Sequence, residues 1–233
     1  MPRRLTLVNM IEDTPAHGRW MAGRNGAGSA GSIPRVADGG RVTETPEGLI
    51  LDPIPAHPLL AGCREIGRGE NTIVVEAGVV EGRARVYKLL TSPTDYAYCT
   101  APDRPVGPHF PVVFADHGIA GPSSRGYPFH IVEVERLYPL PSDGEASELA
   151  ARITTAYFAA CGMWRRLAQD MGRIALYHLV VTPFGWSGAM RDALDSLSTF
   201  TREYGALPDL VKADNLMMRP DGTLVFSDPV FMP

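Results

Sequence analysis

Short apolar runs dominate the chain between residues 64 and 136, whereas apolar positions recur at helical spacing after residue 145. The runs are rich in Val, Ile, Phe and Tyr and are bounded by Gly, Pro or polar residues, which predicts short β-strands. The predicted strands are residues 72–77, 84–90, 110–115 and 128–136. A turn at residues 78–82 joins the first two into a hairpin, and a short helix fits residues 94–100. We therefore expect a small antiparallel sheet in this half.

The second half of the chain predicts helices. Between residues 148 and 169 apolar side chains recur every three or four positions, which indicates an amphipathic helix with its apolar face in the core. A second helix is predicted for residues 188–204 and ends at Gly205. An apolar run at residues 179–184, stopped by Pro183, predicts a short buried segment. Strands followed by helices give an α+β fold class.

The last quarter of the chain contains a predicted hairpin with a polar residue at each end. Two apolar runs, residues 216–218 and 224–226, flank the turn sequence Pro220-Asp-Gly222. Asn215 precedes the first run and Asp228 follows the second, so both side chains emerge at one end of the hairpin. Oxygen ligands of this kind suit Mg²⁺ shared with a nucleotide phosphate. The alternative is that both side chains only satisfy local backbone groups.

A glycine-rich segment joins two strands earlier in the chain. Gly67, Gly69 and Thr72 precede a β-branched run rather than a helix, which favours a flap over phosphates against a dinucleotide-binding loop. An ordinary turn is the alternative. Such a flap predicts a lysine on the next strand, and Lys88 stands there; it could equally mark an edge strand with its charge in water.

The predicted sheet ends just before the helical half, in residues 132–137. In a two-lobed kinase this connection is the hinge whose backbone holds the adenine edge, which makes Glu135 and Leu137 the candidate nucleotide-binding positions. Their side chains are weakly diagnostic because the backbone would make the contacts.

Composition and charge narrow the class of protein. A hydrophobic fraction of 45% and a charged fraction of 21% are typical of a soluble globular chain. The net charge of −4 gives no reason to expect a nucleic-acid partner. Three widely spaced cysteines and no long apolar segment favour a reduced, cytoplasmic protein without a membrane span. Residues 15–45, rich in Gly, Ala, Ser and Arg, predict a flexible extension, and the prolines of residues 53–58 mark a boundary.

The order of these parts resembles the eukaryotic-type protein-kinase fold, and specifically the small early Ser/Thr protein kinases of autographivirus-type podoviral bacteriophages. The resemblance covers about residues 60–233. The features that carry it are the flap of Gly67, Gly69 and Thr72, the Lys88 strand, a short Tyr-containing helix with Cys99, the run Pro108-His-Phe-Pro111, Asn215 and the pair Asp228-Pro229.

The resemblance implies a two-lobed protein with an antiparallel N-lobe at residues 59–138, a truncated, mainly helical C-lobe at residues 139–233 and an extension at residues 1–58. It implies ATP and Mg²⁺ as cofactors, with Asn215 and Asp228 as metal ligands and the flap, Lys88 and the hinge around the nucleotide. The acceptor would be a Ser/Thr hydroxyl of a host bacterial protein in the host cytoplasm. Because the chain ends at Pro233, no residues correspond to the activation segment and the peptide-docking helices of a kinase. Any activity is therefore expected to be constitutive.

The sequence departs from the kinase pattern at the catalytic base. Lys212 falls where the catalytic-loop lysine belongs, but Leu210 occupies the position of the aspartate and Asp209 lies one residue early. Either a one-residue bulge brings Asp209 to the substrate hydroxyl, or the chain is a pseudokinase that acts as a binding or inhibitory protein. A small-molecule phosphotransferase is a third reading. No glutamate is evident to pair with Lys88, and Asp95 is the nearest acid.

Overall fold

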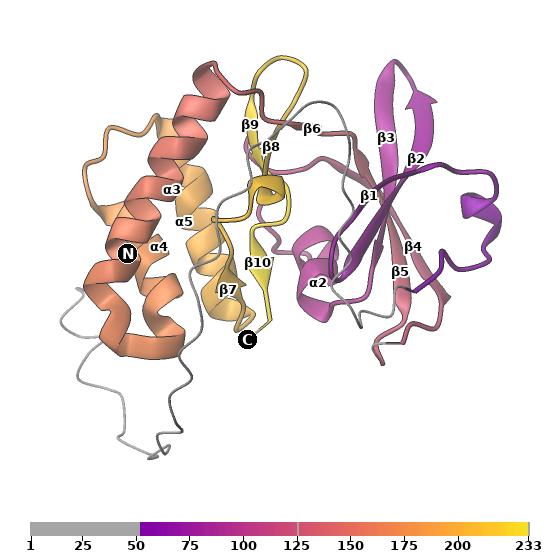
Figure 1. The fold of residues 1–233 in the computed structure, drawn as a ribbon, viewed down its shortest axis with the longest axis horizontal. Coiled ribbons are helices and arrows are strands. Elements are labelled where there is room, and N and C mark those ends of the chain that lie inside the picture. Colours follow the sequence, from indigo (N-terminus) through magenta and orange to yellow (C-terminus); the bar gives the residue numbers. More distant parts are fainter. Residues whose placement is uncertain (1–51, 125, 233) are drawn as a thin grey trace, which may run out of the picture. The chain divides into compact units, whose positions relative to one another are not determined.

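The computed structural model describes residues 52–124 and 126–232, which belong to one compact unit spanning residues 48–233. The predicted flexible extension lies outside the described residues. Within them the chain forms a five-stranded antiparallel sheet, four α-helices and short strands near the C-terminal end (Figure 1). The predicted α+β class is confirmed.

The large sheet contains five strands in the order β1-β2-β3-β5-β4, all antiparallel. Their bounds are β1 (Glu65–Arg68), β2 (Thr72–Val80), β3 (Arg83–Leu90), β4 (Val113–Gly121) and β5 (Phe129–Glu135). The β2–β3 turn places Glu81 and Gly82 at φ 51° and 75°, the left-handed pair that a tight two-residue hairpin requires. The predicted strand at residues 110–115 begins later, at Val113. The carbonyls of His109 and Phe110 accept instead from Phe226 and Arg219, near the C-terminal end.

The two faces of the large sheet have different coverings. On one face Val75, Leu89 and Ile131 are fully buried in a small cluster that includes Leu60 of the 3₁₀ helix η1 (Pro58–Leu60). The opposite face belongs to a much larger core shared with the helices. Its contributions from the sheet are Val86, Leu90, Val132 and Val134.

Helices surround the larger core. Their bounds are α2 (Pro93–Thr100), α3 (Glu145–Trp164), η2 (Arg165–Asp170), α4 (Met171–Val181) and α5 (Gly188–Glu203). Ser92 caps α2 by accepting a hydrogen bond from the Asp95 backbone N–H, and Gly205, at φ +65°, follows the end of α5. No helix among residues 52–124 and 126–232 is both long and apolar enough to span a bilayer.

Two predictions about the helices are wrong in detail. The single predicted helix at residues 148–169 is α3, which ends at Trp164, followed by a kinked 3₁₀ segment. Part of the predicted buried segment at residues 179–184 is the end of α4, an element that the sequence pattern did not predict. Ala175, Leu176 and Leu179 of α4 are fully buried, because α4 packs against both α3 and α5.

The predicted hairpin near the C-terminal end is confirmed. Strand β8 (Leu216–Met218) pairs with β9 (Leu224–Phe226), and β6 (Tyr138–Pro139) pairs with β8 on its other side. A separate pair, β7 (Leu207–Pro208) with β10 (Val230–Phe231), brackets this hairpin. The 3₁₀ turn η3 (Ala213–Asn215) leads into β8.

Candidate functional site

Asn215 stands at the base of the β8–β9 hairpin and ties three chain segments together. Its side chain is buried, and Nδ2 donates to the Asp209 carbonyl at 2.8 Å. Its own carbonyl accepts the Ser227 backbone N–H at 2.8 Å. Because the amide nitrogen is committed to the backbone, Oδ1 is the atom of this side chain that suits a cation. Asp228 follows Ser227 at the same end of the hairpin.

Lys88 lies on β3 and points at the base of that hairpin. Its Nζ donates to the Ser227 carbonyl at 3.0 Å and lies 4.0 Å from the Asp228 carboxylate. The residue is 7% exposed, while the Asp228 side chain is 29% exposed. Strand β3 is flanked by β2 and β5, so the alternative of an edge-strand lysine in water is wrong. The sheet and the hairpin therefore meet at this ammonium group.

Asp95, a buried residue in the first turn of α2, interacts electrostatically with Lys88 and Asp228. Burial raises the pKa of Asp95 to about 7, repulsion from Asp228 adds to the increase, and Lys88 opposes it. Burial acts to lower the pKa of Lys88, but the surrounding negative charges, with Asp228 first, outweigh it and the pKa is raised. Lys88 thus stays charged while Asp95 is about half protonated near neutral pH.

Asp209 and Lys212 form an ion pair beside Asn215. Lys212 Nζ lies 3.0 Å from Asp209 Oδ2, which raises the pKa of Lys212 chiefly through that hydrogen bond. Asp209 is 7% exposed, whereas the Lys212 side chain is 66% exposed. The Asp209 backbone N–H donates to the Pro229 carbonyl at 2.7 Å, immediately after Asp228. The carboxylate is therefore held firmly near the predicted metal-binding residues.

Leu210, which occupies the expected position of the base, points the other way. It is fully buried in the large core, and its carbonyl accepts the Thr154 hydroxyl of α3 at 3.2 Å. The neighbouring Asp209 carboxylate is bound to Lys212 instead of packing in that core.

The predicted flap forms the β1–β2 connection. The Gly69 N–H donates to the Thr72 carbonyl at 2.8 Å, and β1 carries a bulge between Glu65 and Gly67. A Cβ added at Gly67 or Gly69 would meet nothing closer than 3.8 Å, so neither glycine is required by packing. Thr72 is 8% exposed, and its hydroxyl has no hydrogen-bond partner among the described residues.

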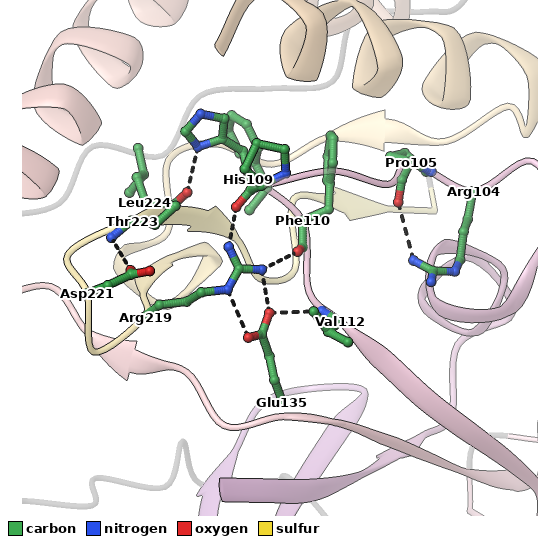
Figure 2. Close-up of polar contacts among 12 residues, drawn as sticks. Arg104, Pro105, His109, Phe110, Val112, Glu135, Arg219, Asp221, Thr223 and Leu224 are labelled. Carbon is green, nitrogen blue, oxygen red and sulfur yellow. Dashed lines mark hydrogen bonds and ion pairs between the residues drawn. The ribbon is translucent and has the colours of Figure 1, made fainter. Parts of the chain in front are cut away.

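The two predicted hinge positions differ. The Glu135 carboxylate accepts from Arg219 Nε at 2.9 Å and Nη2 at 2.6 Å, and from the Val112 N–H at 2.8 Å (Figure 2). The Glu135 N–H donates to the Val112 carbonyl at 2.9 Å. This side chain therefore holds the protein together rather than facing a ligand. Leu137 is half-buried in the short connection between β5 and β6.

Six of the predicted or neighbouring residues thus meet around the base of the hairpin: Lys88, Asp95, Asp209, Lys212, Asn215 and Asp228. Within residues 52–124 and 126–232 no three His, Cys, Asp or Glu side chains gather as a metal site. Sequence reasoning missed the roles of Ser227 and Arg219, since nothing near either residue in the sequence points to partners more than 80 positions away. No protein-family model and no curated protein matches this chain.

Proposed function

We propose that the chain is a two-lobed, protein-kinase-like protein that binds Mg²⁺-ATP and transfers the terminal phosphoryl group to a Ser/Thr hydroxyl. The observation that carries this proposal is the buried Asp209 carboxylate, paired with Lys212 and linked through its backbone to Asn215. An acid, a cation and an amide in this order match the catalytic-loop roles of phosphoryl transfer, with the acid one residue early. The resemblance adds a host bacterial protein as the acceptor and the host cytoplasm as the compartment.

The fold supports a nucleotide between sheet and hairpin. A flap joins β1 to β2, a buried lysine stands on β3, and β5 ends in a short connection to the helical half. These elements occur in the order in which protein kinases place the phosphate flap, the phosphate lysine and the adenine hinge. The carbonyl of Glu135 and the backbone of Leu137 are the groups proposed to meet the adenine edge.

The side chains present suit Mg²⁺ shared with phosphates. Asn215 offers Oδ1 and Asp228 offers a carboxylate, two oxygen ligands from one end of a hairpin. Mg²⁺ usually keeps waters and binds through one or two carboxylates plus substrate phosphates, so a third protein ligand is not needed. When bound, the ion would neutralise charge on the phosphates.

Lys88 and the flap would contact the phosphates. Lys88 is held by the Ser227 carbonyl and stays charged, so its ammonium group is oriented before a ligand arrives. A Cβ at Gly67 or Gly69 would only come into ordinary van der Waals contact, at 3.8 and 3.9 Å, and the proposed role of both glycines is to let a phosphate approach the flap closely. The unpartnered Thr72 hydroxyl is a further donor at the flap.

Asp209 would act as the general base. One carboxylate oxygen is bound to Lys212, which leaves the other to accept the proton of the acceptor hydroxyl. Lys212 is mostly exposed, so it can also approach the transferring phosphoryl group and stabilise its charge. The one-residue displacement relative to the kinase pattern is accommodated by burying Leu210.

A nucleotide-binding pseudokinase is the second candidate. The observation that favours it is that one carboxylate oxygen of Asp209 pairs with Lys212 while its backbone bonds to Pro229 and Asn215. The protein would then bind a nucleotide, but Asp209 would not accept a proton from an acceptor hydroxyl. The protein would then inhibit or recruit a host factor.

The test is phosphate transfer from labelled ATP in a bacterial lysate, for wild type, Asp209→Asn, Asp228→Asn and the control Asp221→Asn. Asp221 lies in the exposed turn of the same hairpin, where it accepts the Thr223 N–H. We expect label transfer in wild type and Asp221→Asn, and its loss in the other two. Wild type that is stabilised by Mg²⁺-ATP but transfers no label supports the pseudokinase, and no response to nucleotide refutes both.

A further inference from the structure

The β8–β9 hairpin is anchored to the large sheet at two places. At its base the Ser227 carbonyl accepts the Lys88 ammonium group, and at its turn Arg219 binds Glu135 at the end of β5. We propose that Arg219 and Glu135 are a positioning pair, which fixes the orientation of the hairpin and with it Asn215 and Asp228. This inference rests on the proposed function, because it assigns these two residues a part in metal-dependent phosphoryl transfer.

The Arg219–Glu135 contact is bidentate and well shielded. Both carboxylate oxygens accept from the guanidinium group, at 2.9 and 2.6 Å, and the two side chains are 16% and 15% exposed. A planar, two-point contact fixes direction as well as distance, unlike a lysine contact. Exposed ion pairs contribute little, whereas a shielded, bidentate pair restrains the segments that carry it.

The segment of residues 108–112 is bound by both Arg219 and Glu135 (Figure 2). Arg219 also donates to the carbonyls of Phe110, at 2.8 Å, and Pro108. The Phe226 N–H donates to the His109 carbonyl at 2.9 Å, and His109 Nδ1 lies 2.8 Å from the Leu224 carbonyl. Residues 108–112 thus run beside β9, which explains why β4 starts only at Val113.

Two anchors restrain the hairpin more than one can. Strand β6 pairs with β8, and the Tyr98 hydroxyl donates to the Phe226 carbonyl at 2.6 Å, so the hairpin is also held along its length. The Arg219–Glu135 contact adds a directional restraint at the turn end of β8. Among the described residues no hydrogen bond or ion pair joins Arg219 or Glu135 to Asn215 or Asp228, so the pair would act through the orientation of β8 and β9. Displacements of about 1 Å at reacting groups can lower rates about a hundredfold.

The test compares Arg219→Met with Arg64→Met, its matched control. Arg64 makes a similar two-bond contact to Glu76, at 3.0 and 2.6 Å, but its side chain is 71% exposed and it does not bind the hairpin. Two quantities are measured: amide hydrogen exchange at Phe226 and Ser227 without nucleotide, and the Mg²⁺ concentration at which ATP gives half its maximal thermal stabilisation. A third variant exchanges the charges by combining Arg219→Glu with Glu135→Arg.

We expect Arg219→Met to speed exchange at the two amides about tenfold and to raise the required Mg²⁺ concentration about fivefold, with neither change in Arg64→Met. The charge-exchanged variant should recover part of both. An unchanged Mg²⁺ requirement in Arg219→Met, with only a lower melting temperature, means that the pair merely stabilises the fold and overturns the positioning role. Wild type without any response to Mg²⁺-ATP instead refutes the proposed function, and the positioning role with it.

Discussion

Replacing Asp95 by asparagine is expected to increase the free energy of unfolding over that of wild type, by an amount that grows with pH. Asp95 is 5% exposed and shares a buried cluster with Lys88 and Asp228. Its ionised form is disfavoured chiefly by burial and then by the nearby Asp228 carboxylate. Asparagine has almost the same shape and carries no charge, so the variant removes the cost of ionisation with little change in packing.

The direction and size follow from the pKa of the folded state. The pKa of Asp95 rises from its ordinary value of 3.8 to about 7. A raised folded-state pKa contributes stability below pH about 4, and this contribution is lost as pH increases through about 7. Three pKa units at about 1.4 kcal/mol each give a ceiling of about 4 kcal/mol. The folded-state pKa of about 7 already includes the attraction between Asp95 and Lys88, so no separate correction for that ion pair is made.

The assay is urea unfolding followed by circular dichroism, at pH values between about 4.5 and 8.5. The free-energy difference between Asp95→Asn and wild type should grow with pH, most steeply between about pH 5 and 6, and should level off above about pH 7. The control is Asp192→Asn, at an exposed position of α5 away from the Asp95 cluster. Parallel pH curves for Asp95→Asn and wild type would show that the carboxyl is not buried against Asp228, and would refute the reasoning.

Three further predictions concern the packing of buried residues. Gly172→Ala puts a Cβ 2.8 Å from the Tyr157 hydroxyl and should cost about 1–3 kcal/mol in urea unfolding, whereas Gly162→Ala on α3, with no atom within 4 Å, should stabilise by up to about 1 kcal/mol. Leu210→Ala should lower the free energy of unfolding by about 2–5 kcal/mol, because Leu210 is fully buried. Burial raises the pKa of Cys99 to about 11, so its thiol should resist iodoacetamide at pH 8 until urea unfolds the protein; rapid native-state alkylation would contradict that burial.

The sequence predicted the elements whose signals are local. Alternating or β-branched runs located β2, β3 and β5, and an Asp-Gly turn between two apolar triplets located the β8–β9 hairpin. Helix α4 was missed because its apolar residues face both α3 and α5, which leaves no polar stripe to reveal the helical period. Residues 110–112 looked like strand for the same local reasons, but their hydrogen bonds go to distant Arg219 and Glu135.

The candidate site was predictable in its residue types but not in its contacts. Lys88, Asn215 and Asp228 stood out through their positions beside strands, and the structure brings Lys88 to 4.0 Å from Asp228. The orientation of Asp209 depends on which neighbour fills the core, and composition alone does not decide between Asp209 and Leu210. The partnership of Arg219 with Glu135 joins positions 84 residues apart and has no local signature.

The large core also determines how this unit comes apart. It joins Val86 and Val134 of the sheet to Ile153, Leu176 and other residues of α3–α5 in one continuous cluster. The strands cannot separate from the helices without exposing apolar surface on both sides, so strand and helix are expected to melt in a single transition. A molecule that binds at the junction of sheet and hairpin would therefore delay the melting of the entire unit, and one melting curve would report occupancy wherever the optical probe sits.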